Sequence, residues 1–258
     1  MCGRFVITSA PAAIRQAFAY VDQPNFPARY NIAPTQPIPV VILDNGARRF
    51  RLMRWGLLPS WVKDPRSFTL LINARAETVR DKPAFRNAFR RRRCLVPADG
   101  YYEWKAGGVR KQPYFIHPAD GGPIGFAALW ETWTGPNGEE LDTVAIVTTA
   151  ATGGLAELHD RVPVTILGED FARWLDPDES AADDAAALLR PPVDGAFAWH
   201  PVSTAVNRVA NDNAQLILPI AAEEAAETPG PVAARPATAK RAARPKPAAD
   251  DGGQGSLF

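Results

Sequence analysis

Cysteine and histidine are scarce in this chain of 258 residues, which holds two cysteines and three histidines. Two cysteines cannot build a disulfide framework, and His117, His159 and His200 stand at none of the close pair spacings of a zinc site. The sequence therefore predicts no metal, no disulfide and no cofactor.

Long apolar runs are also missing. No run approaches the roughly 18 residues that a membrane-crossing helix needs, and the first residues lack the basic-then-apolar pattern of a secretion signal. We therefore expect a cytoplasmic protein with no membrane partner. Hydrophobic residues still make up 46% of the chain and aromatic residues 9%, which is ample for a buried core.

A clear excess of charge of one sign is missing as well, because 29 Lys and Arg stand against 28 Asp and Glu. The field of the whole protein therefore does not indicate a nucleic-acid binder, and any polyanion must be held by a local patch. Arginine is the expected source, since Arg90 to Arg93 are consecutive. A solvated helix end is the simpler interpretation of such a charge run.

Short segments rich in aliphatic and aromatic residues dominate residues 1–220, and Pro, Gly, Asn and Asp turns separate them, which predicts strands. Strands and helices do not alternate regularly, which argues against a doubly wound parallel sheet. We predict the α+β class: a single β-rich domain over residues 1–221, curved and mostly antiparallel, with a few peripheral helices. The expected helices are Ala12 to Ala19, Pro83 to Arg90, Asp170 to Leu175 and Ser180 to Leu189.

One stretch of the chain has the pattern of a β-hairpin. The stretch from Tyr101 to Ile116 is typical of a hairpin that turns at Gly107 and Gly108.

After Ile220 the composition changes sharply to Ala, Pro, Gly and charged residues. Such a segment cannot bury enough apolar surface to offset the entropy lost on ordering, so residues 222–258 are predicted to be a disordered tail.

One of the two cysteines directly follows the first methionine, in MCGRF from Met1 to Phe5. Methionine is commonly trimmed when the second residue is small, so we expect a mature chain that begins at Cys2 with an amine and a thiol on adjacent carbons. Such a 1,2-aminothiol reacts readily with aldehydes. Cys94 has apolar neighbours and is expected to be a small core residue.

Three further stretches hold polar residues whose types make sense beside that terminus. Asn73 and Arg75 follow an apolar strand, Glu103 lies between two aromatic residues, and His159 comes just after a Gly-Gly turn. Taken singly, each has an ordinary structural explanation as a turn amide, a paired cation, a strand-face acid or a helical histidine. The stretches are INARAET at 72–78, ADGYYEW at 98–104 and ELHDR at 157–161.

Together these motifs resemble the SRAP family, the SOS-response-associated peptidases or abasic-site-processing proteins. The resemblance covers about residues 1–220, and the motifs occur in the family's order. They are CGRF at the start, RYNIAPTQ at 29–36, WGLLPSW at 55–61, INARAET, ADGYYEW, a hairpin ending in QPYFI, LHDRVPV at 158–164 and WHPVS at 199–203.

The resemblance implies a target, namely single-stranded DNA with an abasic site whose open sugar exposes an aldehyde. The amine of mature Cys2 would form a Schiff base there, and the thiol would then close a thiazolidine ring, giving a stable protein–DNA crosslink that shields the lesion. By the same resemblance, Glu103 is the general acid–base residue, Asn73 holds the sugar and the N-terminus, and His159 shuttles protons. Lyase activity by β-elimination and self-removal of Met1 are further implied activities.

Binding of single-stranded DNA requires phosphate contacts and stacking surfaces. The matched positions supply phosphate or sugar ligands at Arg4, Arg75 and Arg161, and base-packing surfaces at Trp104, Trp61 and Pro34. We expect the protein to act as a monomer and to join the nucleoid when it is bound to DNA.

Residues 254–258 read QGSLF and resemble the pentapeptide by which many bacterial repair proteins dock on the DNA polymerase sliding clamp. Gln254 would lead the peptide, and Leu257 and Phe258 would enter an apolar pocket. A flexible tether of roughly 30 residues reaches about 30 Å, which would let the folded domain search DNA near the clamp.

Two other functions stay open at this point. Cys2 could be the nucleophile of an N-terminal-nucleophile cysteine peptidase, acting on peptides or only on its own Met1. Alternatively, the protein could be a non-covalent module that binds single-stranded DNA or the clamp, with Cys2 incidental.

Overall fold

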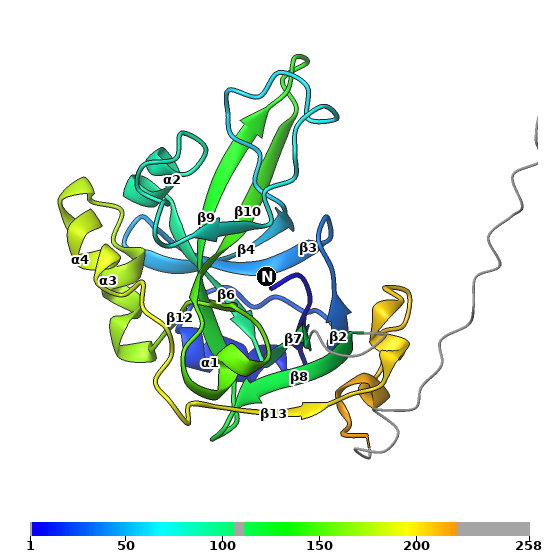
Figure 1. Ribbon diagram of the computed structural model, residues 1–258. Helices are drawn as coiled ribbons and strands as arrows, with labels where there is room; N and C mark the ends of the chain where they lie inside the picture. The colour runs from blue at the N-terminus through cyan, green and yellow to red at the C-terminus, as the bar shows by residue number, and fades with distance from the viewer. Residues whose placement is uncertain (1, 106–110, 221–258) are drawn as a thin grey trace, which may run out of the picture. The chain divides into compact units, whose positions relative to one another are not determined.

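The computed structural model describes residues 2–105 and 111–220 (Figure 1). Within these residues the chain forms two β-sheets with a few short helices, which confirms the expected α+β class. The predicted tail at 222–258, with its QGSLF peptide, lies outside the described residues. No helix in the described part is both long and apolar enough to cross a membrane.

The first sheet is antiparallel throughout, in the order β13-β8-β7-β1-β2. The predicted hairpin is β7 and β8, which pair from Tyr101 opposite Ile116 to Lys105 opposite Gln112. Its turn, with Gly107 and Gly108, lies outside the described residues. The strands are β1 (Phe5–Ile7), β2 (Arg29–Ile32), β7 (Gly100–Lys105), β8 (Gln112–Pro118) and β13 (Phe197–Pro201).

The second sheet closes on itself. From β10 the pairing runs through β4, β3, β6 and β9, and β9 pairs again with β10, which makes a five-stranded barrel. The short strands β5, β11 and β12 attach to its rim. The strands are β3 (Pro37–Asp44), β4 (Ala47–Trp55), β5 (Asn73–Arg75), β6 (Arg93–Ala98), β9 (Ile124–Thr134), β10 (Glu140–Ala150), β11 (Arg161–Pro163) and β12 (Thr165–Ile166).

Strand β10 changes its pairing partners along its length. On one edge, residues 143–144 pair with β4 and residues 146–148 with β5. On the other edge, residues 140–146 pair with β9 and residues 148–150 with β11. The strands β5 and β11 therefore flank the same end of β10, although 85 residues separate the end of β5 at Arg75 from the start of β11 at Arg161.

Aromatic packing joins the two sheets through β1, whose three residues are all buried. The Phe5 ring meets the Trp55 ring of β4 edge-on at 5.2 Å between centroids, and that of Phe126 in β9 at 6.2 Å. Such edge-to-face contacts add to the free energy gained by burying the rings. The start of the chain is thereby held between the first sheet and the barrel.

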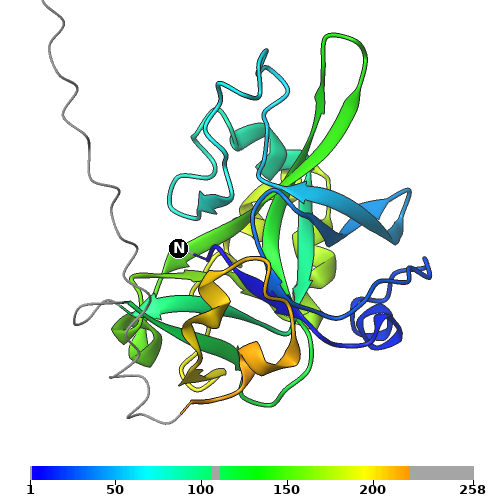
Figure 2. The same ribbon diagram turned by 90° about the vertical axis from the view of Figure 1, so that its right-hand side faces the viewer.

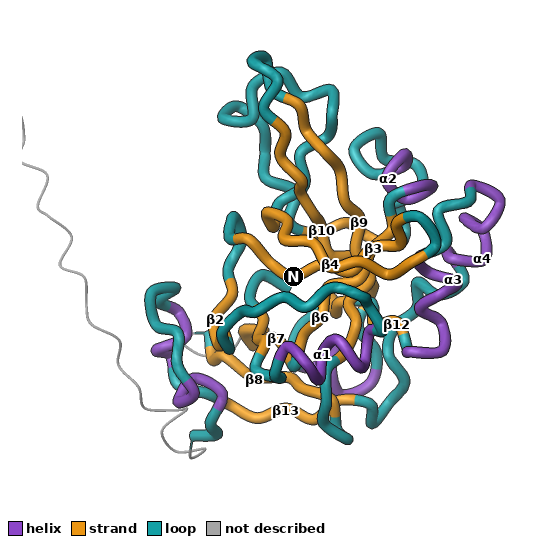
Figure 3. Tube along the Cα trace, turned by 180° about the vertical axis from the view of Figure 1, so that it is seen from behind, coloured by secondary structure: helices purple, strands orange, loops and turns teal. Residues whose placement is uncertain are grey.

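The helices lie around the sheets, as the purple segments in Figure 3 show. In α1 the first helical residue is Pro11, which is favoured there, and Ile14 and Phe18 are buried one turn apart. Helix α4 is shorter than predicted, because a 3₁₀ turn at Glu179–Ala181 forms its entry and the chain turns again after Ala186. The bounds are α1 (Pro11–Phe18), α2 (Arg86–Arg91), α3 (Phe171–Leu175) and α4 (Ala182–Ala186), and the other 3₁₀ turns are Gly153–Glu157, Gly168–Asp170, Thr204–Asn207 and Ala214–Ile217.

Candidate functional site

Cys2 is fully buried where the two sheets meet. Its carbonyl oxygen accepts a hydrogen bond of 2.8 Å from Nδ2 of Asn73, the first residue of β5. The start of a chain usually frays unless it is tied down, and here the Asn73 amide and the surrounding core hold it. The cysteine that the sequence singles out is therefore a fixed part of the interior.

Asn73 reaches Cys2 because β5 pairs with β10, which sets Asn73 opposite Ile146. The preceding residue is also fixed, since the Ile72 carbonyl accepts a hydrogen bond from the Trp55 indole. The Oδ1 atom of Asn73 is buried and has no hydrogen-bond partner among the described residues. An unpaired buried acceptor costs free energy, so this oxygen is poised to accept a hydrogen bond from a ligand.

Glu103, on a strand, and His159, in the loop that precedes β11, approach each other. Glu103 lies on β7 and is only 3% exposed, and its Oε2 is 4.0 Å from Nε2 of His159. The buried Leu155 and Leu158 anchor the turn that leads to His159. The four residues expected to be catalytic, which are Cys2, Asn73, Glu103 and His159, thus gather in one place, and their chemical roles stay predictions.

The contacts of His159 bear on which ring nitrogen carries its proton. Nδ1 lies 3.0 Å from the backbone nitrogen of Arg161 and 2.7 Å from Oδ1 of Asp160. A neutral imidazole cannot form both contacts. The Arg161 backbone N–H requires a lone pair on Nδ1, whereas the Asp160 carboxylate requires a proton on the same atom. The Asp160 side chain is 83% exposed, so water can replace its contact with Nδ1. The hydrogen bond from the Arg161 backbone therefore determines that Nδ1 is the unprotonated nitrogen. In the neutral ring the proton is then on Nε2, the nitrogen that faces Glu103.

Burial changes the acid–base chemistry of the site. It raises the pKa of the Cys2 thiol far above its ordinary value, and the nearby Glu103 carboxylate raises it further. Burial also raises the pKa of Glu103, while His159 opposes that shift. An unburied aminothiol would carry some thiolate at neutral pH. Burial makes the Cys2 thiol harder to deprotonate, so its reaction requires a base, and Glu103 is the adjacent carboxyl.

Tyr101 is a site residue to which the sequence assigned no role. It lies on β7 opposite Phe5 and is 1% exposed, and its hydroxyl has no hydrogen-bond partner among the described residues. Burial raises its pKa, and the charged forms of Cys2 and Glu103 raise it further. The next residue, Tyr102, points to the other face, where its hydroxyl donates to the Tyr30 carbonyl at 2.8 Å.

We predict opposite stability effects for the two tyrosines. Tyr101→Phe removes a buried hydroxyl without a partner and should leave the free energy of unfolding unchanged or raise it, whereas Tyr102→Phe should lower it by about 1 kcal/mol because a made hydrogen bond is lost. Urea denaturation of both variants checks this. An equal loss in both would mean that the Tyr101 hydroxyl is bonded in solution.

The three arginines expected to bind DNA differ in how many protein groups their guanidinium groups already bind. Arg75 is exposed at the end of β5 and forms no ion pair with a described residue. The Arg161 guanidinium forms two hydrogen bonds to the Glu77 carboxylate, at 2.6 and 2.9 Å, and another to the Thr148 carbonyl. Arg4 is half-buried and donates to Asn31 and to the Val206 carbonyl. Of the three, Arg75 is the most available to a phosphate.

The residues expected to pack against bases differ in exposure and in their place in the fold. Trp61 is 58% exposed on the loop after β4, and its ring meets Phe68 edge-on at 5.6 Å. Trp104 is half-buried at the end of β7, and its indole N–H donates to Oδ1 of Asn207 at 2.7 Å. Pro34 is half-buried in the turn between β2 and β3. Trp61 and Trp104 therefore present ring surface, but from different elements.

The arginine run at the end of α2 is largely occupied by protein groups. Arg93 is buried and donates to the carbonyls of Phe89, Trp174 and Asp176. Arg91 pairs with Glu179 and Arg92 with Glu131 beside a hollow of about 470 Å³, which none of the candidate catalytic residues lines. The described residues also contain no group of three or more His, Cys, Asp and Glu side chains placed to hold a metal ion.

The comparisons with known proteins agree on one family. The model of the SOS response associated peptidase (SRAP) family matches residues 1–209. The chain is 36% identical over 221 residues to the abasic site processing protein YoqW of Bacillus subtilis, covering 84% of this chain and 99% of that protein. It is 36% identical over 232 residues to the abasic site processing protein YedK of Escherichia coli, covering 85% and 100%.

A solved structure resembles the fold. The crystal structure of a protein from Bacteroides thetaiotaomicron superposes with a TM-score of 0.74 at 24% identity, covering 85% of this chain and all of that one. At this level of identity the likeness concerns the fold alone.

Proposed function

Because this chain belongs to the SOS response associated peptidase family, we propose that it processes abasic sites in single-stranded DNA by forming a covalent crosslink through Cys2. The names of its relatives as abasic site processing proteins support the target. The observation that carries the chemistry is the held position of Cys2, with Asn73 on its carbonyl and Glu103 beside its thiol.

The proposed reaction begins once Met1 has been removed and Cys2 carries a free amine. The amine nitrogen attacks the aldehyde carbon of the open sugar, and the resulting carbinolamine loses water to form an imine. The thiol sulfur then adds to the imine carbon, and the thiol proton ends on the nitrogen. The product is a thiazolidine ring, and one water molecule is released. A protein that holds amine, thiol and aldehyde together makes the second step effectively intramolecular.

Glu103 is proposed to move the protons of this sequence. The carbinolamine needs an acid to release water, and the protonated thiol needs a base as its sulfur attacks. A carboxyl whose pKa is raised by burial keeps its proton to a higher pH than a solvated carboxyl does, which suits it to donating a proton and taking one back. His159, 4.0 Å from Glu103, is proposed to relay protons between that carboxyl and the sugar oxygen.

The DNA is proposed to bind across the barrel rim. Arg75 follows Asn73 on β5 and is exposed, so it is the first candidate for a phosphate beside the lesion. The exposed ring of Trp61 and the half-buried ring of Trp104 supply faces for unstacked bases. Arg161 is held by Glu77 and Thr148, so a role on the DNA would require it to exchange one of these partners.

A direct experiment tests the proposed function. The purified protein is incubated with single-stranded DNA that either carries an abasic site or is intact, and the mixture is run on a denaturing gel. A band that resists denaturation only with the lesion supports the crosslink, and intact-mass measurement should show Met1 missing. Catalytic cleavage of a peptide without such a band would instead favour a cysteine peptidase, and reversible binding regardless of the lesion would favour a non-covalent module.

We also propose that Gln254, Leu257 and Phe258 bind the DNA polymerase sliding clamp. Removing residues 254–258 is expected to abolish capture of the protein by immobilised clamp, because Leu257 and Phe258 are the apolar anchors of the peptide. The truncated protein should crosslink abasic DNA at the wild-type rate, which serves as the control. Unchanged capture, or no capture of the full chain, would rule out this interaction.

A further inference from the structure

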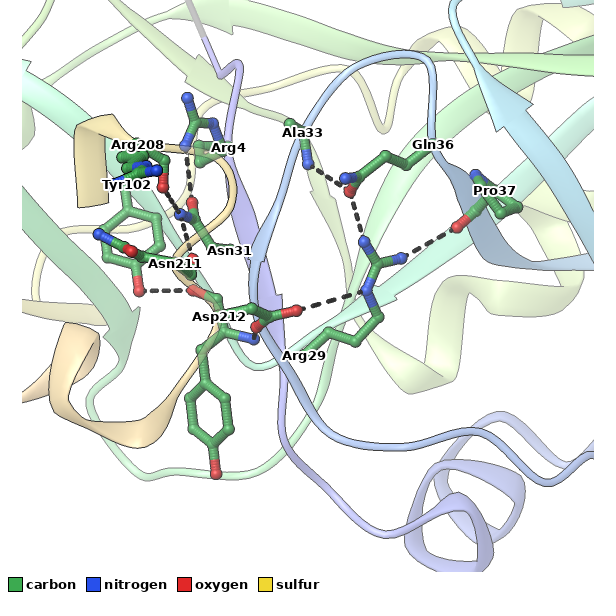
Figure 4. A network of polar contacts seen from close by, with 11 residues as sticks. Arg4, Arg29, Asn31, Ala33, Gln36, Pro37, Tyr102, Arg208, Asn211 and Asp212 are labelled. Carbon is green, nitrogen blue, oxygen red and sulfur yellow. Dashed lines mark hydrogen bonds and ion pairs between the residues drawn. The ribbon is translucent and has the colours of Figure 1, made fainter. Parts of the chain in front are cut away.

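Asn31 on β2 is a buried amide with every polar atom in use. It is 1% exposed, and its Oδ1 accepts a hydrogen bond of 2.7 Å from Nη1 of Arg4 (Figure 4). Its Nδ2 donates to the carbonyls of Val206, Arg208 and Asn211 at 3.2, 3.1 and 2.7 Å. The orientation of the amide is unambiguous, because a guanidinium only donates and carbonyls only accept.

The carbonyls that face Asn31 belong to residues 203–213, which we call the clasp segment. It contains the 3₁₀ turn Thr204–Asn207 and no strand. Figure 2 shows this segment, in orange, beside the start of the chain, in dark blue. Two side chains also fasten it: Asn207 accepts from the Trp104 indole, and Asp212 accepts from the Tyr30 backbone N–H at 2.5 Å.

Arg4 is held at one edge and open at the other. Its Nη1 donates to both Asn31 and the Val206 carbonyl, the latter at 2.8 Å. Its guanidinium carbon lies 5.8 Å from the centre of the Trp104 ring. Its Nε and Nη2 make no hydrogen bond with a described residue, so they remain available for a phosphate oxygen. A guanidinium fixed by one nitrogen loses less freedom when its other nitrogens bind, which raises affinity.

We propose that Asn31 is a positioning residue, which together with the clasp segment fixes the Arg4 guanidinium against Trp104 so that its open edge binds a DNA backbone phosphate next to Cys2. The inference rests on the proposed function, since it assumes that the DNA bound across the barrel rim also reaches this end of the first sheet. It goes further by assigning a role to a buried amide whose hydrogen bonds go to Arg4 and the clasp segment and not to Cys2. Asn31 acts only through Arg4 and the clasp segment.

The test is the salt dependence of binding to intact single-stranded DNA, measured by fluorescence anisotropy below the unfolding temperature of every variant. Each phosphate contact on a single strand contributes about 0.7 to the slope of log affinity against log salt concentration. We expect Arg4→Ala and Asn31→Ala each to lower the slope by about 0.7. The double variant should lose no more than Arg4→Ala alone, because both substitutions remove one contact.

The matched control is Trp174→Phe, which removes the buried indole hydrogen bond to the Cys94 carbonyl and involves neither Arg4 nor the clasp segment. It should lower stability and leave the slope unchanged, so a general structural effect is separated from positioning. If Asn31→Ala does not fold, Asn31→Ser takes its place, because its hydroxyl leaves a polar group in the site but ends one bond short of the amide oxygen that holds Arg4.

An unchanged slope in the Asn31 variant, or in Arg4→Ala, would overturn the inference. The same proteins are also incubated with abasic DNA. A wild-type protein that binds DNA with the expected slopes but forms no crosslink would contradict the proposed function and leave the role of Asn31 intact, so the two failures can be told apart.

Discussion

Cys2→Ala is expected to lower the yield of denaturation-resistant crosslink by at least about 100-fold, because an amine without an adjacent thiol gives only a reversible adduct. The measurement is a denaturing gel after incubation with abasic single-stranded DNA. Adding borohydride should restore a band in this variant, since reduction traps the Schiff base that its free amine still forms. The thiol and the amine are thereby assigned to separate steps.

The matched control keeps the thiol and removes the free amine. Inserting an alanine between Met1 and Cys2 leaves the cysteine in the chain, but its nitrogen is then part of a peptide bond. We expect neither a stable band nor a band with borohydride through that residue. A full yield from this variant, or from Cys2→Ala without borohydride, would contradict a thiazolidine mechanism.

Glu103→Gln is expected to slow crosslink formation by about 100- to 10,000-fold, the usual contribution of a positioned acid–base group. The amide keeps the shape of the side chain but can neither take the thiol proton nor deliver a proton to the departing water. The rate is measured in single-turnover gels. Glu131→Gln is the control, because its carboxylate pairs with Arg92 beside a hollow that Cys2 does not line. An equal rate in both variants would remove Glu103 from the proton transfers.

The same substitution should change how stability depends on pH. Burial raises the pKa of Glu103 above its ordinary value of 4.5, so folding favours the protonated carboxyl. This contribution to the free energy of unfolding is fully present below pH 4.5 and is lost as the pH rises through the raised pKa. Urea denaturation across that range should show wild-type stability declining relative to Glu103→Gln. A difference that stays constant with pH would contradict the raised pKa.

Much of the fold follows from local patterns. The runs of β-branched and aromatic residues in β3, β9 and β10 predict strands, and the pair of Ile14 and Phe18 predicts α1. Closure of the barrel does not follow, because it depends on β9 and β10 pairing while β10 also accepts β4 on its other edge. Such long-range pairings leave no periodic signal in the chain.

The candidate site, too, was only partly predictable from local sequence patterns. The motifs indicate Cys2, Asn73, Glu103 and His159 as residue types suited to one reaction, and they do so without any contact being known. Tyr101 and Asn31 were not assigned roles, although both lie within quoted motifs. Their importance arises from a hydroxyl left without a partner and from four hydrogen bonds to distant segments.

The sequence by itself determined which reactive groups the protein owns and the family to which it belongs. Only the tertiary structure decided their surroundings: burial raises the pKa of the Cys2 thiol, Arg161 is bound to Glu77, and Arg4 is held by Asn31. The physical reason is that identity is a local property of the chain. The pKa, burial and partners of a side chain depend on groups that folding brings from far along the sequence.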